Sequence, residues 1–317
     1  MNYRLLIIII IIILILIFIN NIHLYEHICD TSKYIVCYPV GGFCDMLHII
    51  DRCLNYAIKY NRILMIDTCK TWFQHDIYKY ITFTHKNIYN KLSYQLFDKA
   101  SIYQASFKNI LNREFTIVDK TDYNNFKKYK VYTSLGDEIN TDLSLEYKED
   151  VLIYSCGGGG IPFTLIKYLH FNKIVLDKYY KRLNILPKKY TSFHIRNTDY
   201  KSDVKTFLEK HHNILTNNSC FIATDNITTR DEIKKKYGAT IYYFSDIPKV
   251  KTGGIHLNPI KMDHTTFIID CIVDILLLAS ANEYYYSSTQ SGYSKFALYL
   301  FTNKNILNNL VNISDPI

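Results

Sequence analysis

A regular alternation of strand and helix patterns constrains the fold of this chain more than any other feature of its sequence. A strand-like stretch at 34–38 is followed by a glycine turn, Gly41-Gly42, and then by a helical pattern of apolar residues spaced three or four apart. An apolar strand follows at 63–66. Strand, helix and strand in this order form a βαβ unit, whose two strands run parallel. The first part of the chain is therefore predicted to hold a parallel sheet.

The same alternation returns in the second part. The predicted strands lie at 192–195, 220–223, 240–244 and 283–287, and the predicted helices lie from about 204, at 230–237, at 265–280 and at 293–301. The run of four glycines at 157–160 breaks the chain, and we place the domain boundary after it, giving domains at 31–165 and 166–317. The predicted fold class is α/β, with two Rossmann-like domains that face each other across a cleft.

The N-terminus carries the longest apolar run, 5–19, directly after Arg4. A helix over this run would be roughly 22 Å long, which spans a membrane only if the bilayer thins or the helix extends. A cleaved signal peptide has an apolar region of similar length, but no small-residue cleavage site follows here. We expect residues 1–30 to be an uncleaved signal-anchor and short stem. Because Arg4 would stay on the cytoplasmic side, the predicted protein is a single-pass type II membrane protein with a lumenal body.

The composition excludes few partners. A formal charge of +8 suits an anionic ligand, although lysines scattered over the surface explain it equally well, and no nucleic-acid-binding motif is present. The eight cysteines show no CxxC or zinc-ligand spacing, and their pairing in a lumenal compartment cannot be read from the sequence. Three N-x-[ST] sequons permit glycosylation of the chain. No Asp-x-Asp pair occurs, which fits a site that uses no metal ion.

The most informative polar cluster follows the strand at 192–195. His194, Arg196 and Asp199 lie at or just beyond its carboxyl end, where open α/β sheets bind ligands. The planar guanidinium of Arg196 is suited to two oxygens of a diphosphate, and Asp199 would orient that group or cap the turn. An ordinary strand-to-loop exit with surface charges explains the same residues.

A second polar tip, Thr224-Asp225, follows the strand at 220–223. If the two strands are neighbours, Asp225 should lie at the same sheet edge as Arg196. A Thr-Asp pair is also a good helix N-cap, which explains these residues without a ligand.

A turn rich in hydroxyl groups precedes the last predicted helix. Gln290, Ser291 and Ser294 would place free N–H groups and a positive helix end around a phosphate. Simple N-capping by Ser291 or Ser294 explains the same pattern. Asp274, in the middle of the preceding helix, lies either on a solvent face or accepts a hydrogen bond from a nucleotide base.

The glycine turn of the first part, Gly41-Gly42, does not follow a GxGxxG or Walker pattern, so dinucleotide and P-loop sites are not predicted. A plain tight turn explains it, or a backbone that approaches a ligand closely.

Four segments, in this order along the chain, resemble the α1,6-fucosyltransferase family, which includes the core and Nod-factor enzymes. The match covers roughly 34–75 and 190–300. The segments that carry it are Gly42-Phe43-Cys44 with Leu47-His48, His194-Ile195-Arg196-Asn197-Thr198-Asp199, Phe221-Ile222-Ala223-Thr224-Asp225, and Asp274 with Gln290-Ser291-Gly292-Tyr293-Ser294.

The resemblance implies a GT-B fold and an inverting transfer of fucose from GDP-fucose to a glycan or other hydroxyl acceptor, with no metal and no cofactor. It implies that Arg196 holds the β-phosphate and that His194 and Asp274 contact the guanine nucleoside. Gln290, Ser291 and Ser294 would assist the phosphates, together with Gly41 and Gly42, and Asp225 would organise the site.

The chain departs from the family pattern at several positions. Asn197 stands where the core enzymes carry a second arginine, and Val204 stands where they carry the glutamate proposed to activate the acceptor. Asp203, one residue away, is therefore our expected proton acceptor. Two alternatives remain open from the sequence: a transferase of the same fold that uses another nucleotide sugar, and an inactive membrane glycoprotein that binds sugar nucleotides. The oligomeric state stays unassigned.

Overall fold

The computed structural model describes residues 33–69, 71–90, 142–148, 150–156, 158–199, 202–248 and 262–312, together with three short strands between 115 and 139. The predicted signal-anchor and stem at 1–30 lie outside the described residues. Among the helices that are described, none combines the length and the apolar character needed to cross a bilayer.

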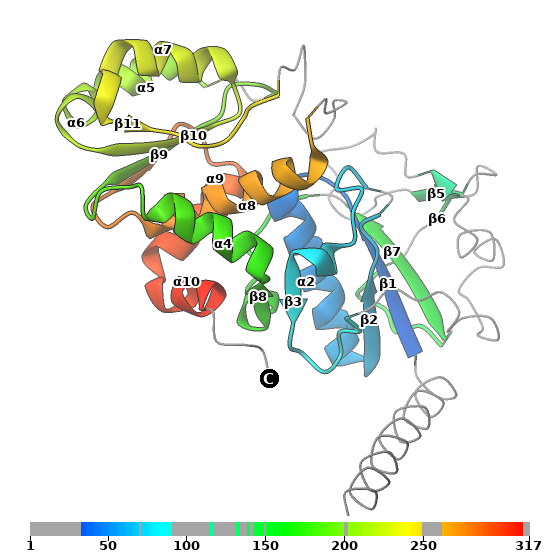
Figure 1. The fold of residues 1–317 in the computed structure, drawn as a ribbon. Coiled ribbons are helices and arrows are strands. Elements are labelled where there is room, and N and C mark those ends of the chain that lie inside the picture. The colour runs from blue at the N-terminus through cyan, green and yellow to red at the C-terminus, as the bar shows by residue number, and fades with distance from the viewer. Residues whose placement is uncertain are drawn as a thin grey trace, which may run out of the picture.

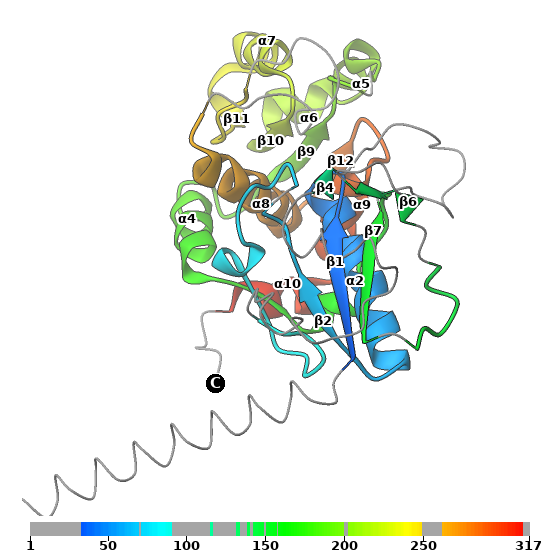
Figure 2. The same ribbon diagram turned by 90° about the vertical axis from the view of Figure 1, so that its right-hand side faces the viewer.

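The first part is built on a parallel sheet in the order β2-β1-β7. Its strands are β1 (Lys33–Pro39), β2 (Arg62–Ile66) and β7 (Val151–Cys156). The predicted βαβ unit is confirmed, with α2 (Phe43–Lys59) as the crossover helix packed along the sheet (Figures 1 and 2). The sequence did not predict β7, which pairs with β1 from more than one hundred residues away.

Short antiparallel strands complete this part. β3 (Ile81–Phe83), after the 3-10 helix η1 (Ile77–Lys79), pairs with β8 (Leu169–Phe171). The predicted boundary at 165/166 falls inside another 3-10 helix, η4 (Leu165–Lys167), so β8 lies beyond the boundary yet pairs with a strand of the first part. A separate three-stranded sheet consists of β4 (Phe115–Thr116), β5 (Val131–Thr133) and β6 (Glu138–Ile139).

The second part holds a four-stranded sheet in the order β11-β10-β9-β12, and every pair is parallel. The strands are β9 (Thr191–Ile195), β10 (Cys220–Thr224), β11 (Ile241–Tyr242) and β12 (Tyr285–Ser287). All four lie within the predicted stretches or extend them by one residue. The predicted alternation in this part is therefore confirmed.

Helices cover both faces of the second sheet (Figure 1). One face packs against α5, α6 and α7 through a small apolar core that includes Phe193 and Ile222. The other face packs against α8, which itself packs along α4. The bounds are α4 (Lys173–Leu183), α5 (Val204–Lys210), α6 (His212–Asn217), α7 (Ile227–Tyr237), the 3-10 helix η5 (Gly238–Thr240) and α8 (His264–Ser280).

The last two helices join the two parts. α9 (Gly292–Thr302) contacts α2, and α10 (Lys304–Val311) contacts β8, although both follow the second sheet in sequence. The buried side chains of α2, α8, α9 and α10 belong to one continuous apolar cluster. The cleft between the two parts is therefore bounded by α2 on one side and by the strand ends of the second sheet on the other.

Candidate functional site

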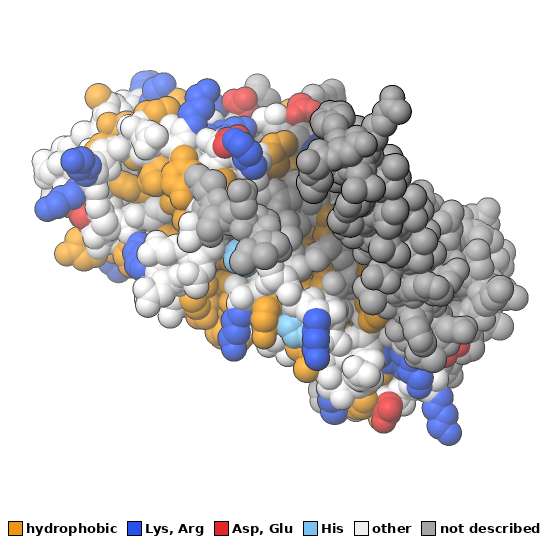
Figure 3. Space-filling model, turned by 60° about the horizontal axis from the view of Figure 1, so that its bottom comes forward, with side chains coloured by type: hydrophobic (Ala, Val, Ile, Leu, Met, Phe, Trp, Pro, Cys, Tyr) orange, Lys and Arg blue, Asp and Glu red, His pale blue; other side chains and the backbone are white. Residues whose placement is uncertain are grey.

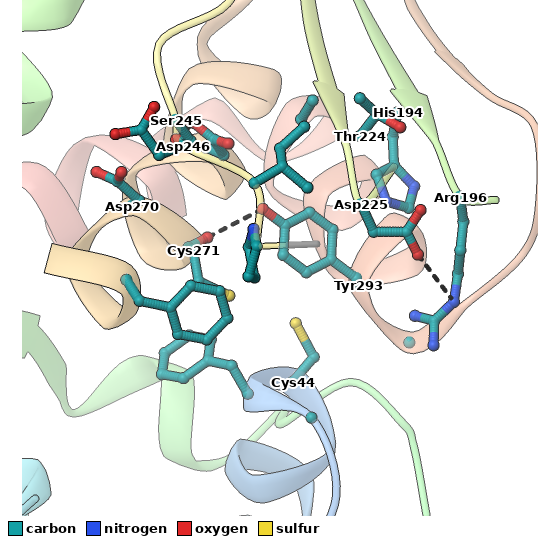
Figure 4. Close-up of a pocket in the computed structure, with 18 of the residues that line it drawn as sticks. Cys44, His194, Arg196, Thr224, Asp225, Ser245, Asp246, Asp270, Cys271 and Tyr293 are labelled. Atoms are coloured by element: carbon teal, nitrogen blue, oxygen red, sulfur yellow. Dashed lines mark hydrogen bonds and ion pairs between the residues drawn. The ribbon is translucent and has the colours of Figure 1, made fainter. Parts of the chain in front are cut away.

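A cavity of about 170 Å³ opens where the two parts meet (Figure 4). Its walls come from the start of α2, the carboxyl ends of β9 and β10, the segment after β11, α8, and the start of α9. The carboxyl edge of a parallel sheet is where α/β folds bind ligands. Of the residues predicted from the sequence, those that line this cavity are Gly42, His194, Arg196, Asp225 and Asp274.

Arg196 extends from the end of β9 and is held by a paired contact with Asp199. Its Nε donates to Asp199 Oδ1 at 3.0 Å, and Nη2 donates to both carboxylate oxygens at 2.8 Å. Burial acts to lower the pKa of Arg196, but Asp199, Asp225 and Asp45 together raise it. The guanidinium therefore keeps its charge. Among the described residues, no hydrogen bond uses its Nη1, which leaves that nitrogen for a ligand oxygen.

Asp225 organises the loop that carries Arg196. It accepts the backbone N–H of Asn197 at 2.7 Å and the hydroxyl of Thr198 at 2.6 Å. Its Oδ2 lies 3.9 Å from Arg196 Nε (Figure 4). The predicted proximity of the two strand ends is thus confirmed, because β9 and β10 pair directly. Burial raises the pKa of the Asp225 carboxyl, which the two hydrogen bonds and Arg196 oppose.

His194 is buried on the side of β9 that faces the cavity. Its ring stacks on Tyr293, with centroids 4.9 Å apart and planes inclined by 28°, and Nδ1 lies 3.3 Å from Ser287 Oγ. Burial, together with the nearby Arg196 charge, lowers the pKa of His194 to about 3. The imidazole is therefore neutral near neutral pH. Because Nδ1 is engaged by Ser287, Nε2 is the ring nitrogen that can donate to or accept from a ligand, depending on the tautomer.

Asp274 does not lie on a solvent face, so that interpretation was wrong. Its side chain is 14% exposed and lines the cavity. The hydroxyl of Ser245 donates to Asp274 Oδ1 at 2.8 Å, and Arg182 Nη1 lies 3.5 Å from the same oxygen. Burial raises the pKa of Asp274 to about 7, although Arg182 and Ser245 act against that rise.

The hydroxyl turn before α9 does not place its side chains in the cavity as the sequence predicted. Ser291 Oγ accepts the backbone N–H of Ser294 at 3.2 Å and caps the helix, while the Ser294 hydroxyl donates to the carbonyl of Thr289 at 2.8 Å. Gln290 is exposed. Both hydroxyls are thus used within the turn, as in the N-capping alternative, and the residues of this turn that line the cavity are Gly292 and Tyr293.

Asp203 also lies away from the cavity. It is exposed and accepts the backbone N–H of Thr206 at 3.1 Å, which makes it the N-cap of α5. A cap residue after a loop is common, and no local pattern of residues distinguishes it from a catalytic carboxylate.

Asp45 lines the cavity and was missed by the sequence reasoning. Its Oδ2 accepts the N–H of Gly42 at 3.1 Å, while its other oxygen packs against two further glycines. A Cβ on Gly159 would lie 2.6 Å from Asp45 Oδ1, and a Cβ on Gly292 would lie 3.0 Å from it. Gly41 adopts φ +96°, a conformation that favours glycine. Glycines from three segments thus leave room for this carboxylate.

Aromatic side chains form another wall of the cavity. Trp72, the single tryptophan of the chain, packs edge-on against Phe267 with ring centroids 6.0 Å apart, and both line the cavity with Phe43. Trp72 Nε1 donates to the carbonyl of Gly41, which fixes the glycine turn beside it. Trp72 was not predicted from the sequence as a residue of the site.

The charges outside the cavity show no single basic patch on the face in Figure 3, where lysine and arginine side chains are scattered. This distribution agrees with the interpretation of the +8 charge as dispersed surface lysines. Within the described part of the chain, no three His, Cys, Asp or Glu side chains are placed to hold a metal ion together.

Comparison with known proteins gives a fold-level match. No family model and no curated protein sequence matches the chain. Solved structures of NodZ match the fold of the chain. Fucosyltransferase NodZ from Bradyrhizobium superposes with a TM-score of 0.54 at 12% identity, covering 86% of this chain and 94% of NodZ.

Two further NodZ structures match to a similar extent. NodZ α1,6-fucosyltransferase co-crystallised with GDP gives a TM-score of 0.53 at 10% identity, covering 86% of this chain and 93% of NodZ. The form soaked with GDP-fucose also gives 0.53 at 10% identity, covering 85% and 93%. The resemblance read from the motifs is thus confirmed at the level of the fold, and the chain has the α/β architecture of the α1,6-fucosyltransferase NodZ.

Proposed function

We propose that this protein is a fucosyltransferase that moves fucose from GDP-fucose to a hydroxyl of a glycan or other acceptor. The observation that carries the proposal is the meeting of Arg196 and Asp274 in one cavity, the first at the end of β9 and the second within α8. The guanidinium of Arg196 suits a diphosphate, and the carboxylate of Asp274 suits the hydrogen-bonding edge of a nucleotide base. The shared fold with NodZ, which was co-crystallised with GDP and soaked with GDP-fucose, supports the same assignment.

The proposed reaction is a direct displacement at the anomeric carbon. The acceptor oxygen forms a bond to that carbon, the bond from the carbon to the β-phosphate oxygen breaks, and the configuration inverts. Negative charge grows on the leaving GDP as this bond breaks. Arg196 stabilises that charge through its open Nη1, so its effect is larger in the transition state than in the ground state. The reaction is proposed to need no metal ion.

The nucleoside end of the donor would lie against Asp274 and His194. Guanine presents N–H donors at N1 and N2, and an ionised carboxylate accepts both, whereas the uracil edge of UDP offers one N–H. The neutral His194, stacked on Tyr293, offers a donor or an acceptor to the nucleoside without adding charge.

The acceptor must lose a proton during the transfer. Asp203 does not line the cavity and instead caps α5, so it is not placed for this step. Among the described residues that line the cavity, Asp45 is the carboxylate that the first part contributes, on the side we assign to the acceptor. Asp45 therefore replaces Asp203 as our proposed proton acceptor.

Calorimetric titration of the protein with GDP, UDP and GDP-fucose tests the proposal. We expect GDP and GDP-fucose to bind more tightly than UDP, and Asp274→Ala to weaken GDP binding by about 1.5–3 kcal/mol while UDP changes little. Tight binding of UDP would favour a transferase for another nucleotide sugar. Binding of GDP-fucose without turnover on any glycan would favour the inactive glycoprotein.

We further propose that the N-terminal apolar run anchors the protein and that the body is lumenal. The support is the charge of Arg4 ahead of the run at 5–19. Protease treatment of sealed microsomes should leave the body intact until detergent is added. Digestion without detergent would contradict this topology.

A further inference from the structure

A buried cluster of charges lies directly behind Asp274, on α4 and α8. Lys178 and Arg182 are one helical turn apart on α4, and Asp270 and Asp274 are one turn apart on α8. Lys178 Nζ lies 2.5 Å from Asp270 Oδ1, and Arg182 Nη2 lies 2.7 Å from the same oxygen. The two aspartates would repel each other at this spacing, so the cations of α4 stabilise the pair.

Arg182 contacts several groups in this region in addition to Asp270. It is 7% exposed, and its Nη1 lies 3.0 Å from Ser245 Oγ and 3.5 Å from Asp274 Oδ1. Its Nη2 also donates to the carbonyl of Phe244 at 3.2 Å. One guanidinium thus fixes the cavity segment after β11, the serine that bonds to Asp274, and Asp274 itself.

The contacts on Asp274 are asymmetric. Both the Ser245 hydroxyl and Arg182 approach Oδ1. Among the described residues, no hydrogen bond reaches Oδ2. Because Asp274 lines the cavity and is anchored through Oδ1, it presents Oδ2 to a ligand. Ser245 and Asp270, which line the same cavity, are labelled in Figure 4.

We propose that Arg182 is a positioning residue that holds Asp274 ionised and oriented, and that it thereby determines the preference of the cavity for a guanine base. This inference rests on the proposed function, since it assumes that Asp274 meets the base of the donor. Guanine needs an acceptor at Asp274, whereas a protonated carboxyl presents a donor to the N1–H of guanine and loses that contact.

The charged and titratable groups that face Asp274 come from three helices: Lys178 and Arg182 on α4, Asp270 and Cys271 on α8, and Tyr293 on α9. Burial, with a smaller contribution from Asp270, raises the pKa of Asp274 to about 7, against the opposing effects of Arg182, Ser245 and Lys178. Loss of Arg182 must therefore move the pKa of Asp274 upward. Binding of GDP, which needs the ionised form, should then require a higher pH.

The test measures the affinity of the full-length protein for GDP and UDP from pH 6 to pH 9. In Arg182→Gln, the midpoint of the pH dependence of GDP affinity should rise by about one pH unit. At pH values below the midpoint, about tenfold less of the Asp274 carboxyl is then ionised than in the wild-type protein. GDP binding should be about tenfold weaker at pH 6.5 and close to wild type at pH 9. The affinity for UDP should change by less than about threefold at each pH, because UDP carries the same titrating diphosphate as GDP but does not need the ionised Asp274.

Two controls separate positioning from folding. Lys173→Ala removes a cation from the same helix, but its partner Asp177 is exposed, so GDP affinity should match wild type at every pH. Adding Arg182→Gln to Asp274→Asn should cause no further shift, since the titrating group is gone. If Arg182→Gln does not fold, Arg182→Lys takes its place. It keeps the charge but lacks the paired donors, and should shift the midpoint in the same direction by less.

Equal losses for GDP and UDP with an unchanged midpoint would overturn the inference, because a merely structural arginine acts on both ligands alike. An unchanged midpoint in a folded Arg182→Lys would overturn it too if Arg182→Gln cannot be studied. Equal affinities of the wild-type protein for GDP and UDP would instead refute the proposed function.

Discussion

Thr198 donates its hydroxyl proton to Asp225 at 2.6 Å, and this bond joins the polar ends of β9 and β10. Asp225 also accepts the N–H of Asn197, so Asp225→Ala leaves two donors without their charged acceptor. We expect the free energy of unfolding to fall by about 1.5–3 kcal/mol in urea titrations. Thr198→Val, which removes one of the donors, should cost about 1 kcal/mol. Wild-type stability in Asp225→Ala would show that the loop does not depend on this carboxylate.

Arg196→Lys should lose most of the transfer activity although it keeps the charge. Lysine offers a point charge on a flexible stem, whereas the planar guanidinium can hold Asp199 through Nε and Nη2 and still donate to the diphosphate from Nη1. We expect kcat to fall on the order of 10²–10³-fold, since the stabilised charge grows during bond breaking. Asn197, where the core enzymes have arginine, leaves no neighbour to compensate. Arg230→Lys is the control, because Arg230 pairs with exposed Asp231. A kcat above about a third of wild type would remove Arg196 from this role.

Gly159→Ala should destabilise the protein through Asp45. The new Cβ would lie 2.6 Å from Asp45 Oδ1, so the backbone or the carboxylate must move, at a cost of about 1–3 kcal/mol in the free energy of unfolding. In an Asp45→Ala background the same substitution should cost less than half as much. Gly42→Ala serves as control, because its Cβ would meet Asp45 at 3.5 Å, an ordinary contact. A cost independent of Asp45 would mean that another contact excludes the side chain.

Asp274→Asn should change how stability depends on pH in the ligand-free protein. The pKa of Asp274 is about 7 when folded and near 3.8 when unfolded, so ionisation destabilises the folded state as pH rises from about 4 to 7. The variant lacks this penalty. Its free energy of unfolding relative to wild type should therefore increase across that window, by up to about 4 kcal/mol, and stay constant above pH 8. A difference that does not vary with pH would contradict the assignment.

Chelation should leave transfer unaffected. The proposal relies on Arg196 to stabilise the charge of the diphosphate, and no Asp-x-Asp pair is present. We expect equal turnover in EDTA and in Mn²⁺ when transfer of labelled fucose is measured. Loss of turnover in EDTA that either Mn²⁺ or Mg²⁺ restores would refute the metal-independent mechanism.

The strand ends of the second sheet could be predicted from the sequence because local signals agree there. An apolar strand that stops at a polar tip occurs twice, at Arg196 and at Asp225, and parallel pairing brings such tips together. Asp274 was also singled out from the sequence, but its burial could not be predicted because it depends on the packing of α8 against α4. Nothing in the sequence near 274 indicates that Arg182 lies opposite.

The remaining site residues escaped because their roles depend on distant partners. The sequence around Ser291 and around Asp203 fits a ligand contact and a helix cap equally well, and in the structure both side chains cap helices. Asp45 directly follows Gly42-Phe43-Cys44 in the sequence, yet only the approach of Gly159 and Gly292 distinguishes it from an ordinary helix residue. β7 was missed because its partner β1 is remote in sequence, and because the apolar residues in the region before β7 show no regular spacing.

The return of α9 and α10 to the first part has a consequence for how the chain is made. The helix that packs on α2 lies more than two hundred residues further along the chain, so α2 is synthesised long before it. Until that helix is made, part of the apolar surface of α2 has no partner within the nascent chain. The two parts should therefore not mature one after the other. We expect their final packing to occur together once α9 and α10 have been synthesised, slowly because the contacts are remote in sequence, and with assistance from chaperones that bind exposed apolar segments.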